Sequence, residues 1–131
     1  MHGFAHTALV TLLALIIYFV MGVRVARARG KYKVAAPATT GDPQFERHFR
    51  VQMNTLEWLP IFLPALWLAA ASWGDQIAAE IGAVWVVGRV IYMVTYVADP
   101  KTRSAGFLIQ ALATLTLIGG ALFNIVRPML G

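Results

Sequence analysis

Residues 4–23 read FAHTALVTLLALIIYFVMGV, and this stretch decides the class of fold. A helix that spans a lipid bilayer needs about 20 predominantly apolar residues, and only one histidine and two threonines interrupt this run. No Lys or Arg precedes it, whereas Arg24, Arg27 and Arg29 follow it. A secretory signal peptide has the reverse arrangement of charge, so we interpret the run as a membrane helix that stays in the protein.

Three further apolar blocks follow along the chain, at residues 59–72, 77–98 and 104–126. The block at 59–72 is too short to span a bilayer alone, so we expect its helix to begin upstream, near Phe45. Pro100 favours a break after the third block, because the residue before a proline disfavours helical geometry. The sequence therefore predicts four helices, at about residues 4–29, 44–72, 76–99 and 103–127.

The composition indicates the same class of protein. Of the 131 residues, 59% are hydrophobic and 13% are charged, against roughly 45–50% and about 25% in soluble domains. Such a chain cannot fold as a small soluble domain without exposing a large apolar patch. It holds no cysteine, which excludes disulfides, thiolate metal sites and cysteine nucleophiles. We therefore predict an all-α integral membrane protein with a single domain over residues 1–131.

The connections between the blocks are short, at about residues 24–44, 73–75 and 99–102. Short connections between long helices favour antiparallel neighbours, and hence an up-down four-helix bundle. Lys and Arg gather beside the first and third connections, and the second has none. By the positive-inside rule, loops 1 and 3 of this multi-pass protein face the cytoplasm, and in a prokaryote the membrane would be the inner one. The net charge of +5 is explained by these flanking bases, so we expect no nucleic-acid partner.

Polar residues within the predicted second helix form one stripe. Arg50, Asn54, Glu57 and Trp58 are spaced i, i+4, i+7 and i+8, which places them on one helix face. Gln52 points away from Arg50, by about 200°, and is therefore a candidate for contact with a neighbouring chain. Charged groups inside a membrane helix are costly and persist where they pair or serve a site.

The predicted third helix carries a second polar stripe. Arg89, Tyr92, Tyr96 and Asp99 are spaced i, i+3, i+7 and i+10. Arg89 is a natural partner for a buried ion pair with Glu57, either as a purely structural contact or as part of a site. The three histidines lack the spacing of metal ligands, so we expect no metal site.

Several polar and aromatic residues allow a structural explanation as well as a functional one. Tyrosines near a membrane surface often only anchor the helix. Trp67, Trp73 and Trp85 are expected to face lipid or the membrane interface. Ser104 follows Arg103 at the predicted start of the last helix, where a helix N-cap is the simpler role.

Several stretches of the sequence resemble the MAPEG family, the membrane-associated proteins in eicosanoid and glutathione metabolism. The stretch PQFERHFRVQMNTLEWLPIFLPALW at residues 43–67 matches the family's second-helix pattern E-R-x-x-R-x-Q-x-N-x-x-E without a gap. PATTG at 37–41 resembles the family's loop, and GRVIYMVTY at 88–96 and TRSAGF at 102–107 resemble its third and fourth helices. The similarity covers nearly the whole chain and is nearest to the leukotriene C4 synthase and microsomal glutathione transferase branch.

The resemblance implies a homotrimer with glutathione bound between subunits near the cytoplasmic side. It implies Arg103 as the catalytic residue at the glutathione sulfur, with Tyr96 beside it. Arg29 and Gln52 are expected to reach the site from the neighbouring subunit. Trp58 replaces a tyrosine of the leukotriene synthase pattern, and Gly30 replaces its second arginine. The full set of expected glutathione-binding residues is Arg29, Arg50, Gln52, Asn54, Glu57, Trp58, Arg89, Tyr92, Tyr96 and Arg103.

These residue types suit the chemistry of glutathione. Arginines bind its two carboxylates, and an acid binds its ammonium group. A guanidinium and a helix N-terminus both lower the pKa of a thiol, which favours the reactive thiolate. The expected function is therefore a glutathione S-transferase, with possible glutathione peroxidase activity, whose lipophilic second substrate arrives through the membrane lipid. The alternatives are a non-enzymatic lipid-binding protein of the same fold and a small transporter subunit built around Glu57 and Arg89.

Overall fold

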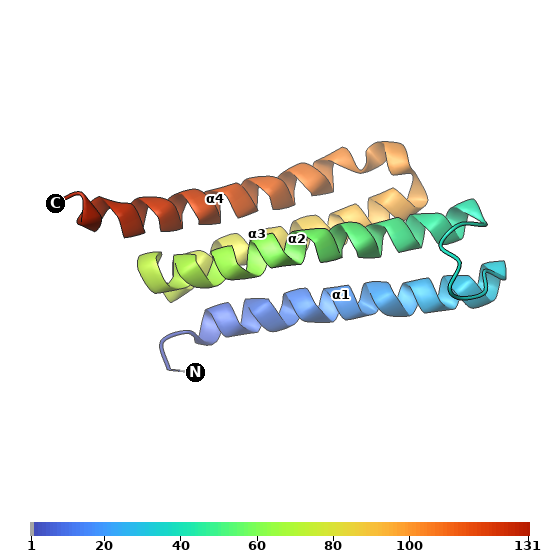
Figure 1. Cartoon of the computed structure of the whole chain (residues 1–131), viewed down its shortest axis with the longest axis horizontal. Coiled ribbons are helices and arrows are strands. Elements are labelled where there is room, and N and C mark those ends of the chain that lie inside the picture. The colour runs from blue at the N-terminus through green and yellow to red at the C-terminus, as the bar shows by residue number, and fades with distance from the viewer. Residues whose placement is uncertain (1) are drawn as a thin grey trace.

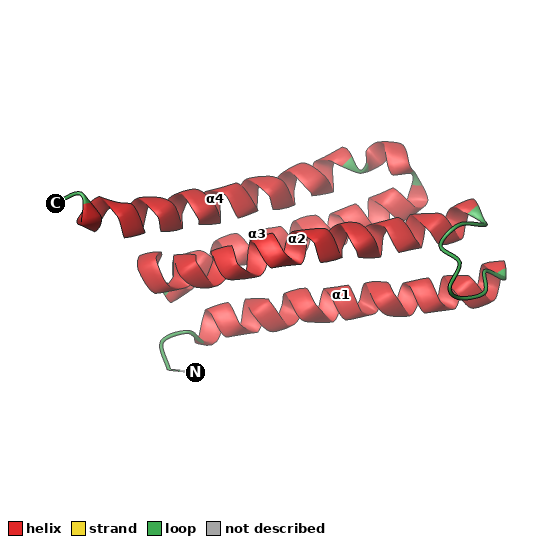
Figure 2. Ribbon diagram, in the orientation of Figure 1, coloured by secondary structure: helices red, strands yellow, loops and turns green. Residues whose placement is uncertain are grey.

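The computed structural model describes residues 2–131 and consists of long helices (Figure 2). The four helices are α1 (Ala5–Tyr32), α2 (Pro43–Trp73), α3 (Asp75–Ala98) and α4 (Ser104–Met129), and a short 3-10 helix, η1 (Pro100–Thr102), precedes α4. Each long helix is long and apolar enough to cross a membrane. The all-α prediction of a four-helix membrane bundle is confirmed.

The four helices alternate in direction along the bundle (Figure 1). The α1–α2 connection and the α3–α4 connection lie at one end, and the α2–α3 turn lies at the other end. Both α1 and α4 pack against α2 and α3, on opposite sides of this central pair. The predicted up-down order of helices is therefore correct, with α2 and α3 as the centre.

The first connection is shorter than we expected from the sequence. Helix α1 continues to Tyr32, three residues beyond its predicted end at residue 29, and includes the basic residues beside the connection. Arginine and lysine are good helix formers whose long side chains reach water from a helix end, so charge alone does not stop the helix. It ends where Lys33 adopts the left-handed conformation, with φ 56°. The connection then occupies residues 33–42.

Two aspartates cap helix ends at opposite ends of the bundle. Asp42 precedes α2, and its carboxylate accepts a hydrogen bond from the backbone N–H of Gln44 at 2.8 Å. Asp75 opens α3 after a turn formed by Gly74 alone, and its carboxylate caps α1 instead. It accepts from the backbone N–H of Thr7 at 2.8 Å and of His6 at 3.1 Å. The α2–α3 turn is thereby fixed to the start of α1, since free N–H groups at a helix start need acceptors.

The tryptophans depart in part from our expectation. Trp85 is fully buried and stacks on Phe62, with ring centroids 3.9 Å apart and planes at 3°. Its assignment to a lipid-facing position was wrong, because α3 is a central helix and this face meets α2. Trp67 is half-buried and donates to the hydroxyl of Thr11 at 3.0 Å, and Trp73 is exposed.

Large apolar side chains cover the outside of the bundle. They are densest on α1 and α4, the two outer helices, where lipid is the only medium that suits them. Together with the four spanning helices, this surface identifies an integral multi-pass membrane protein. Examples with more than half of their surface exposed are Leu9, Leu12, Ile16, Phe19, Leu108, Leu112, Leu115, Leu122 and Phe123.

Helices α3 and α4 approach each other closely through glycines. A Cβ added at Gly88 would lie 2.8 Å from the backbone N of Gln110, and one at Gly106 would collide with the backbone of Tyr92. Both glycines are buried. They allow the first turns of α4 to lie directly against the part of α3 that carries the second polar stripe.

We expect Gly106→Ala to push α4 away from α3 and to lower the free energy of unfolding by about 1–3 kcal/mol, as overpacking does. Gly119→Ala is the matched control on the same helix, since nothing lies within 4 Å of its added Cβ. The control should be neutral or slightly stabilising, because alanine favours helix by up to about 1 kcal/mol. Thermal unfolding in detergent measures both, and equal midpoints for the two variants would contradict the close approach.

Candidate active site

A fully buried arginine lies between the central helices. Both terminal nitrogens of Arg89 donate to Oδ1 of Asn54, each at 2.8 Å, and Nη1 also donates to the hydroxyl of Thr55 at 3.1 Å. Its guanidinium lies 4.5 Å from the ring centroid of Tyr92. The charge is therefore solvated by an amide, a hydroxyl and a π face, and its Nε has no partner.

The ion pair that we expected between Glu57 and Arg89 does not form. Within residues 2–131 the single contact with the geometry of an ion pair joins His6 to Asp75 and involves neither Glu57 nor Arg89. Glu57 is exposed, three residues beyond Asn54 on α2. Burying two charges has a desolvation cost that can exceed their attraction, and Asn54 supplies two hydrogen bonds without a second charge. The structure therefore does not support the alternative of a transporter subunit built around Glu57 and Arg89.

The contact with Arg89 fixes the orientation of Asn54. Because Oδ1 accepts both bonds from the guanidinium, the amide NH2 of Asn54 is left to donate elsewhere. The same residue lines a cavity of about 300 Å³, in the lower part of the roughly 300–1,000 Å³ range of ligand pockets. The cavity is lined by Asn54, Tyr92, Arg103, Ser104, Phe107 and Leu108.

Arg103 stands at the mouth of this cavity and at the start of α4. It is exposed, and its Nη1 donates to the carbonyl oxygen of Pro100 at 2.8 Å. A guanidinium has five N–H donors, so this bond orients the side chain and leaves donors for a ligand. The N-terminus of α4 adds a partial positive charge at the same place. The two together favour an anion here.

Ser104 differs from the simpler role that we assigned to it. The N-cap position of α4 is Arg103, Ser104 is the first helical residue, and no side chain caps this helix. Ser104 lines the cavity instead, with Phe107 and Leu108 one turn later. We did not single out the latter two, although their i+3 and i+4 spacing from Ser104 places them on its face of the helix.

A second cavity adjoins the first. Arg50 and Tyr96 line a space of about 200 Å³ together with Pro43, Glu46 and Arg47. The ring of Tyr96 lies 5.4 Å from that of Tyr92, which lines the first cavity. The two tyrosines thus connect the cavities, and Arg50 and Arg103 each contribute a guanidinium to one of them.

The remaining residues of the second-helix stripe lie at the rim. Trp58 packs edge-on against Phe107, with ring centroids 5.6 Å apart and planes at 83°. Glu57 immediately precedes Trp58, is exposed, and forms no ion pair within residues 2–131. Its carboxylate is therefore exposed about one helical turn beyond Asn54, which lines the first cavity.

Arg29 and Gln52 lie apart from both cavities of their own chain. Nη1 of Arg29 donates to the carbonyl oxygen of Ala38 at 2.6 Å, and its guanidinium lies 4.8 Å from the ring centroid of Phe45. The amide of Gln52 faces α1 at Gly22. Within one chain, the structure thus separates these two residues from the other members of the expected set.

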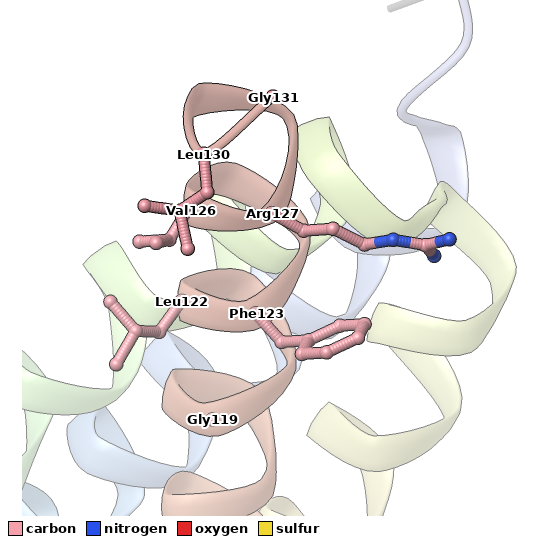
Figure 3. Close-up of a pocket in the computed structure, with 7 residues that line it drawn as sticks. All are labelled: Gly119, Leu122, Phe123, Val126, Arg127, Leu130 and Gly131. Carbon is pink, nitrogen blue, oxygen red and sulfur yellow. The ribbon is translucent and has the colours of Figure 1, made fainter.

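Neither a cavity at the far end of α4 nor the acidic and histidine residues of the described chain form a catalytic group. The cavity, of about 580 Å³, lies at the far end of α4 and is lined only by residues of that end, with Arg127 as the single charge (Figure 3). No group of three or more His, Cys, Asp or Glu that could hold a metal gathers in residues 2–131.

Comparison of the sequence with known proteins identifies the family of this chain. The sequence profile of the MAPEG family matches residues 7–123. The chain belongs to the MAPEG family. Among its relatives, an uncharacterized protein of Synechocystis, sll1147, is 48% identical over 91% of this chain and 87% of its own length.

Two further MAPEG relatives carry functional names. Human microsomal glutathione S-transferase 2 is 43% identical over 78% of this chain and 69% of its own length. Leukotriene C4 synthase of Cavia porcellus is 34% identical over 94% of this chain and 93% of its own length. The resemblance found from the second-helix motif is thereby confirmed at the level of the family.

We expect the two residues of the buried Arg89–Asn54 contact to differ in how much their replacement lowers the free energy of unfolding. Asn54→Leu should lower the free energy of unfolding by about 1.5–3 kcal/mol, because a buried cation loses its main acceptor. Arg89→Met should cost less, since removing the charge also removes its desolvation penalty. Thermal unfolding without ligand measures both.

The double variant Asn54→Leu/Arg89→Met completes the cycle. We expect it to be more stable than Asn54→Leu alone, because no unsolvated charge remains. Additive losses in the double variant would contradict a direct interaction between these two side chains.

Proposed function

We propose that this protein is a membrane glutathione transferase that conjugates the thiolate of glutathione to lipophilic electrophiles. The cavity in which Arg103, Tyr92 and Asn54 meet carries the proposal. It joins an exposed guanidinium, a helix N-terminus and hydrogen-bond donors beside an apolar surface. Relatives named as glutathione transferases in the same family support it.

Arg103 is the proposed catalytic residue. Its guanidinium and the N-terminus of α4 both favour an anion at one point, so a thiol placed there has a lowered pKa and reacts as thiolate. The thiol proton leaves to water, and the thiolate sulfur then attacks the electrophile. With a chlorinated nitrobenzene the carbon–sulfur bond forms, the carbon–chlorine bond breaks, and chloride leaves to water. Tyr96, 5.4 Å from Tyr92 across the two cavities, is proposed to orient the sulfur or to donate to an anion that develops on the electrophile.

The remainder of glutathione would extend toward the second cavity. Arg50 there is suited to bidentate binding of a carboxylate. Glu57 at the rim is suited to the ammonium group, and Asn54 donates through the NH2 that Arg89 leaves free. Arg89 itself does not line the cavity, so we assign it a positioning role rather than the direct contact that we expected from its stripe. Trp58 shapes the rim through Phe107.

An apolar groove continues from the first cavity along α4. Leu108 lines that cavity, and Leu112, one turn later, lines a groove of about 350 Å³ between α3 and α4. The other residues of the groove are Ile81, Val84, Ile109, Ala113 and Thr116. A lipophilic second substrate, or a lipid hydroperoxide in a glutathione peroxidase reaction, can reach the thiolate along this surface from the membrane lipid.

A homotrimer with the site at the cytoplasmic side completes the proposal. Arg29 and Gln52 lie away from the cavities of their own chain, which suits a contribution to the site of a neighbouring subunit. The site lies at the end of the bundle that holds the α1–α2 and α3–α4 connections, and these are the connections with flanking bases. The alternative of a non-enzymatic lipid-binding protein is not favoured, since the two relatives with functional names described above are named as enzymes.

Arg103→Ala should lower kcat/KM for conjugation of glutathione to a chlorinated nitrobenzene by about a hundredfold, as loss of one stabilising donor does. The thiolate absorbance of bound glutathione should then appear only at higher pH, toward the ordinary thiol pKa of roughly 8.5, because the group that favoured the anion is gone. Arg127→Ala, at the far end of α4, is the control and should leave both unchanged. An unaltered thiolate titration in Arg103→Ala would refute the assignment.

A mixed assembly tests the sharing of sites between subunits. Arg103→Ala and Gln52→Ala chains with different tags are co-expressed, and assemblies that contain both are isolated. Because an intact site needs Arg103 from one subunit and Gln52 from its neighbour, the mixed assembly should be more active than either pure variant. Activity equal to the mean of the two parents would indicate that both residues act within one chain.

A further inference from the structure

A third charged cavity, distinct from the two of the proposed catalytic site, lies on the other side of the bundle from Arg103. It has a volume of about 300 Å³ and is formed by the last turns of α1 and the first turns of α2. None of its lining residues belongs to the proposed catalytic site. They are Arg24, Arg27, Ala28, Lys31, Tyr32 and His48.

Three cations line this cavity without a compensating acid. Arg24, Arg27 and Lys31 are spaced i, i+3 and i+7 on α1, which places them on one face. Within residues 2–131 the single ion pair is elsewhere, between His6 and Asp75. Arg29, on another face of the same helix, is by contrast tied to the backbone carbonyl of Ala38. The cavity thus concentrates unpaired positive charge at one point.

The face of α1 that carries these cations becomes apolar farther along the helix. Val20 and Ile16 precede Arg24 by four and eight residues, so they continue the same stripe, and both are exposed. Val20 lies about 6 Å and Ile16 about 12 Å below Arg24 along the helix axis. A ligand that fits the whole stripe has an anionic head and apolar chains that extend into the membrane.

We propose that this cavity binds an anionic phospholipid. Its phosphate lies among Arg24, Arg27 and Lys31, and its acyl chains lie along Val20 and Ile16. Guanidinium groups bind phosphate oxygens in a bidentate manner, and basic residues just outside a spanning segment attract anionic lipids. Bases that only set the orientation of α1 need to be at this end of the helix but need no common cavity, so the grouping on one face is the feature that indicates a ligand.

Native mass spectrometry of the purified full chain tests the proposal. The protein in neutral detergent is titrated with phosphatidylglycerol, with phosphatidylcholine, or with inorganic phosphate. We expect phosphatidylglycerol to bind in preference to phosphatidylcholine, and inorganic phosphate at the same concentration neither to bind nor to displace it. Equal binding of the two lipids would overturn the proposal, and saturation by inorganic phosphate would assign the cavity to a soluble anion instead.

Two double variants separate a specific site from general attraction to charge. Arg24→Gln/Lys31→Gln should weaken binding of phosphatidylglycerol by about thirtyfold, from the usual contribution of two basic residues beside an anionic lipid. Lys33→Gln/Lys101→Gln removes the same charge at the same end of the bundle but outside the cavity, and should change binding less than threefold, a margin of roughly 0.6 kcal/mol. Equal weakening by both variants would overturn the proposal. Glutathione conjugation by both is expected to stay at the wild-type rate, which shows that they are folded and that lipid binding is separate from the catalytic function.

Discussion

The hydrogen bonds from Arg89 to Asn54 are the constraint on which the arrangement of the site depends. A guanidinium that is wholly buried between membrane helices needs acceptors for its N–H groups. Nε is left without a partner, whereas Asn54 and Thr55 of α2 accept three hydrogen bonds from the two terminal nitrogens. They fix the relative position of α2 and α3, and they fix which atoms of Asn54 face the cavity. Arg89 thus fixes the orientation of a polar side chain of the site, although Arg89 itself does not line the cavity.

The sequence predicted the fold to within a few residues because membrane helices have a simple signature. Apolar length specified the four helices, and short connections specified their alternating directions. The resemblance to the family implied that Asn54, Tyr92 and Arg103 share one site, and the structure brings these three residues to one cavity. The family was identified from one ungapped motif in α2.

What the sequence could not predict depended on packing between helices. Arg89 pairs with the amide of Asn54 rather than with Glu57. Asn54 and Glu57 lie on the same stripe of α2, so helical spacing alone could not predict which of them reaches the guanidinium. Trp85 was assigned to lipid because composition does not distinguish the central helices from the outer ones. Ser104 was assigned to a cap because the 3-10 helix, which moves the N-cap position to Arg103, has no signal in helical periodicity.

The carboxylate of Asp75 has a consequence for biogenesis. It accepts the backbone N–H of Thr7, 68 positions earlier in the chain. When α1 enters the membrane during translation, its first turn therefore has no such acceptor, and it gains one only after the whole of α2 has followed and the chain has turned back at Gly74. The start of α1 is thus capped by a residue from the start of α3, so this end of α1 receives its acceptor only when α3 has been synthesised.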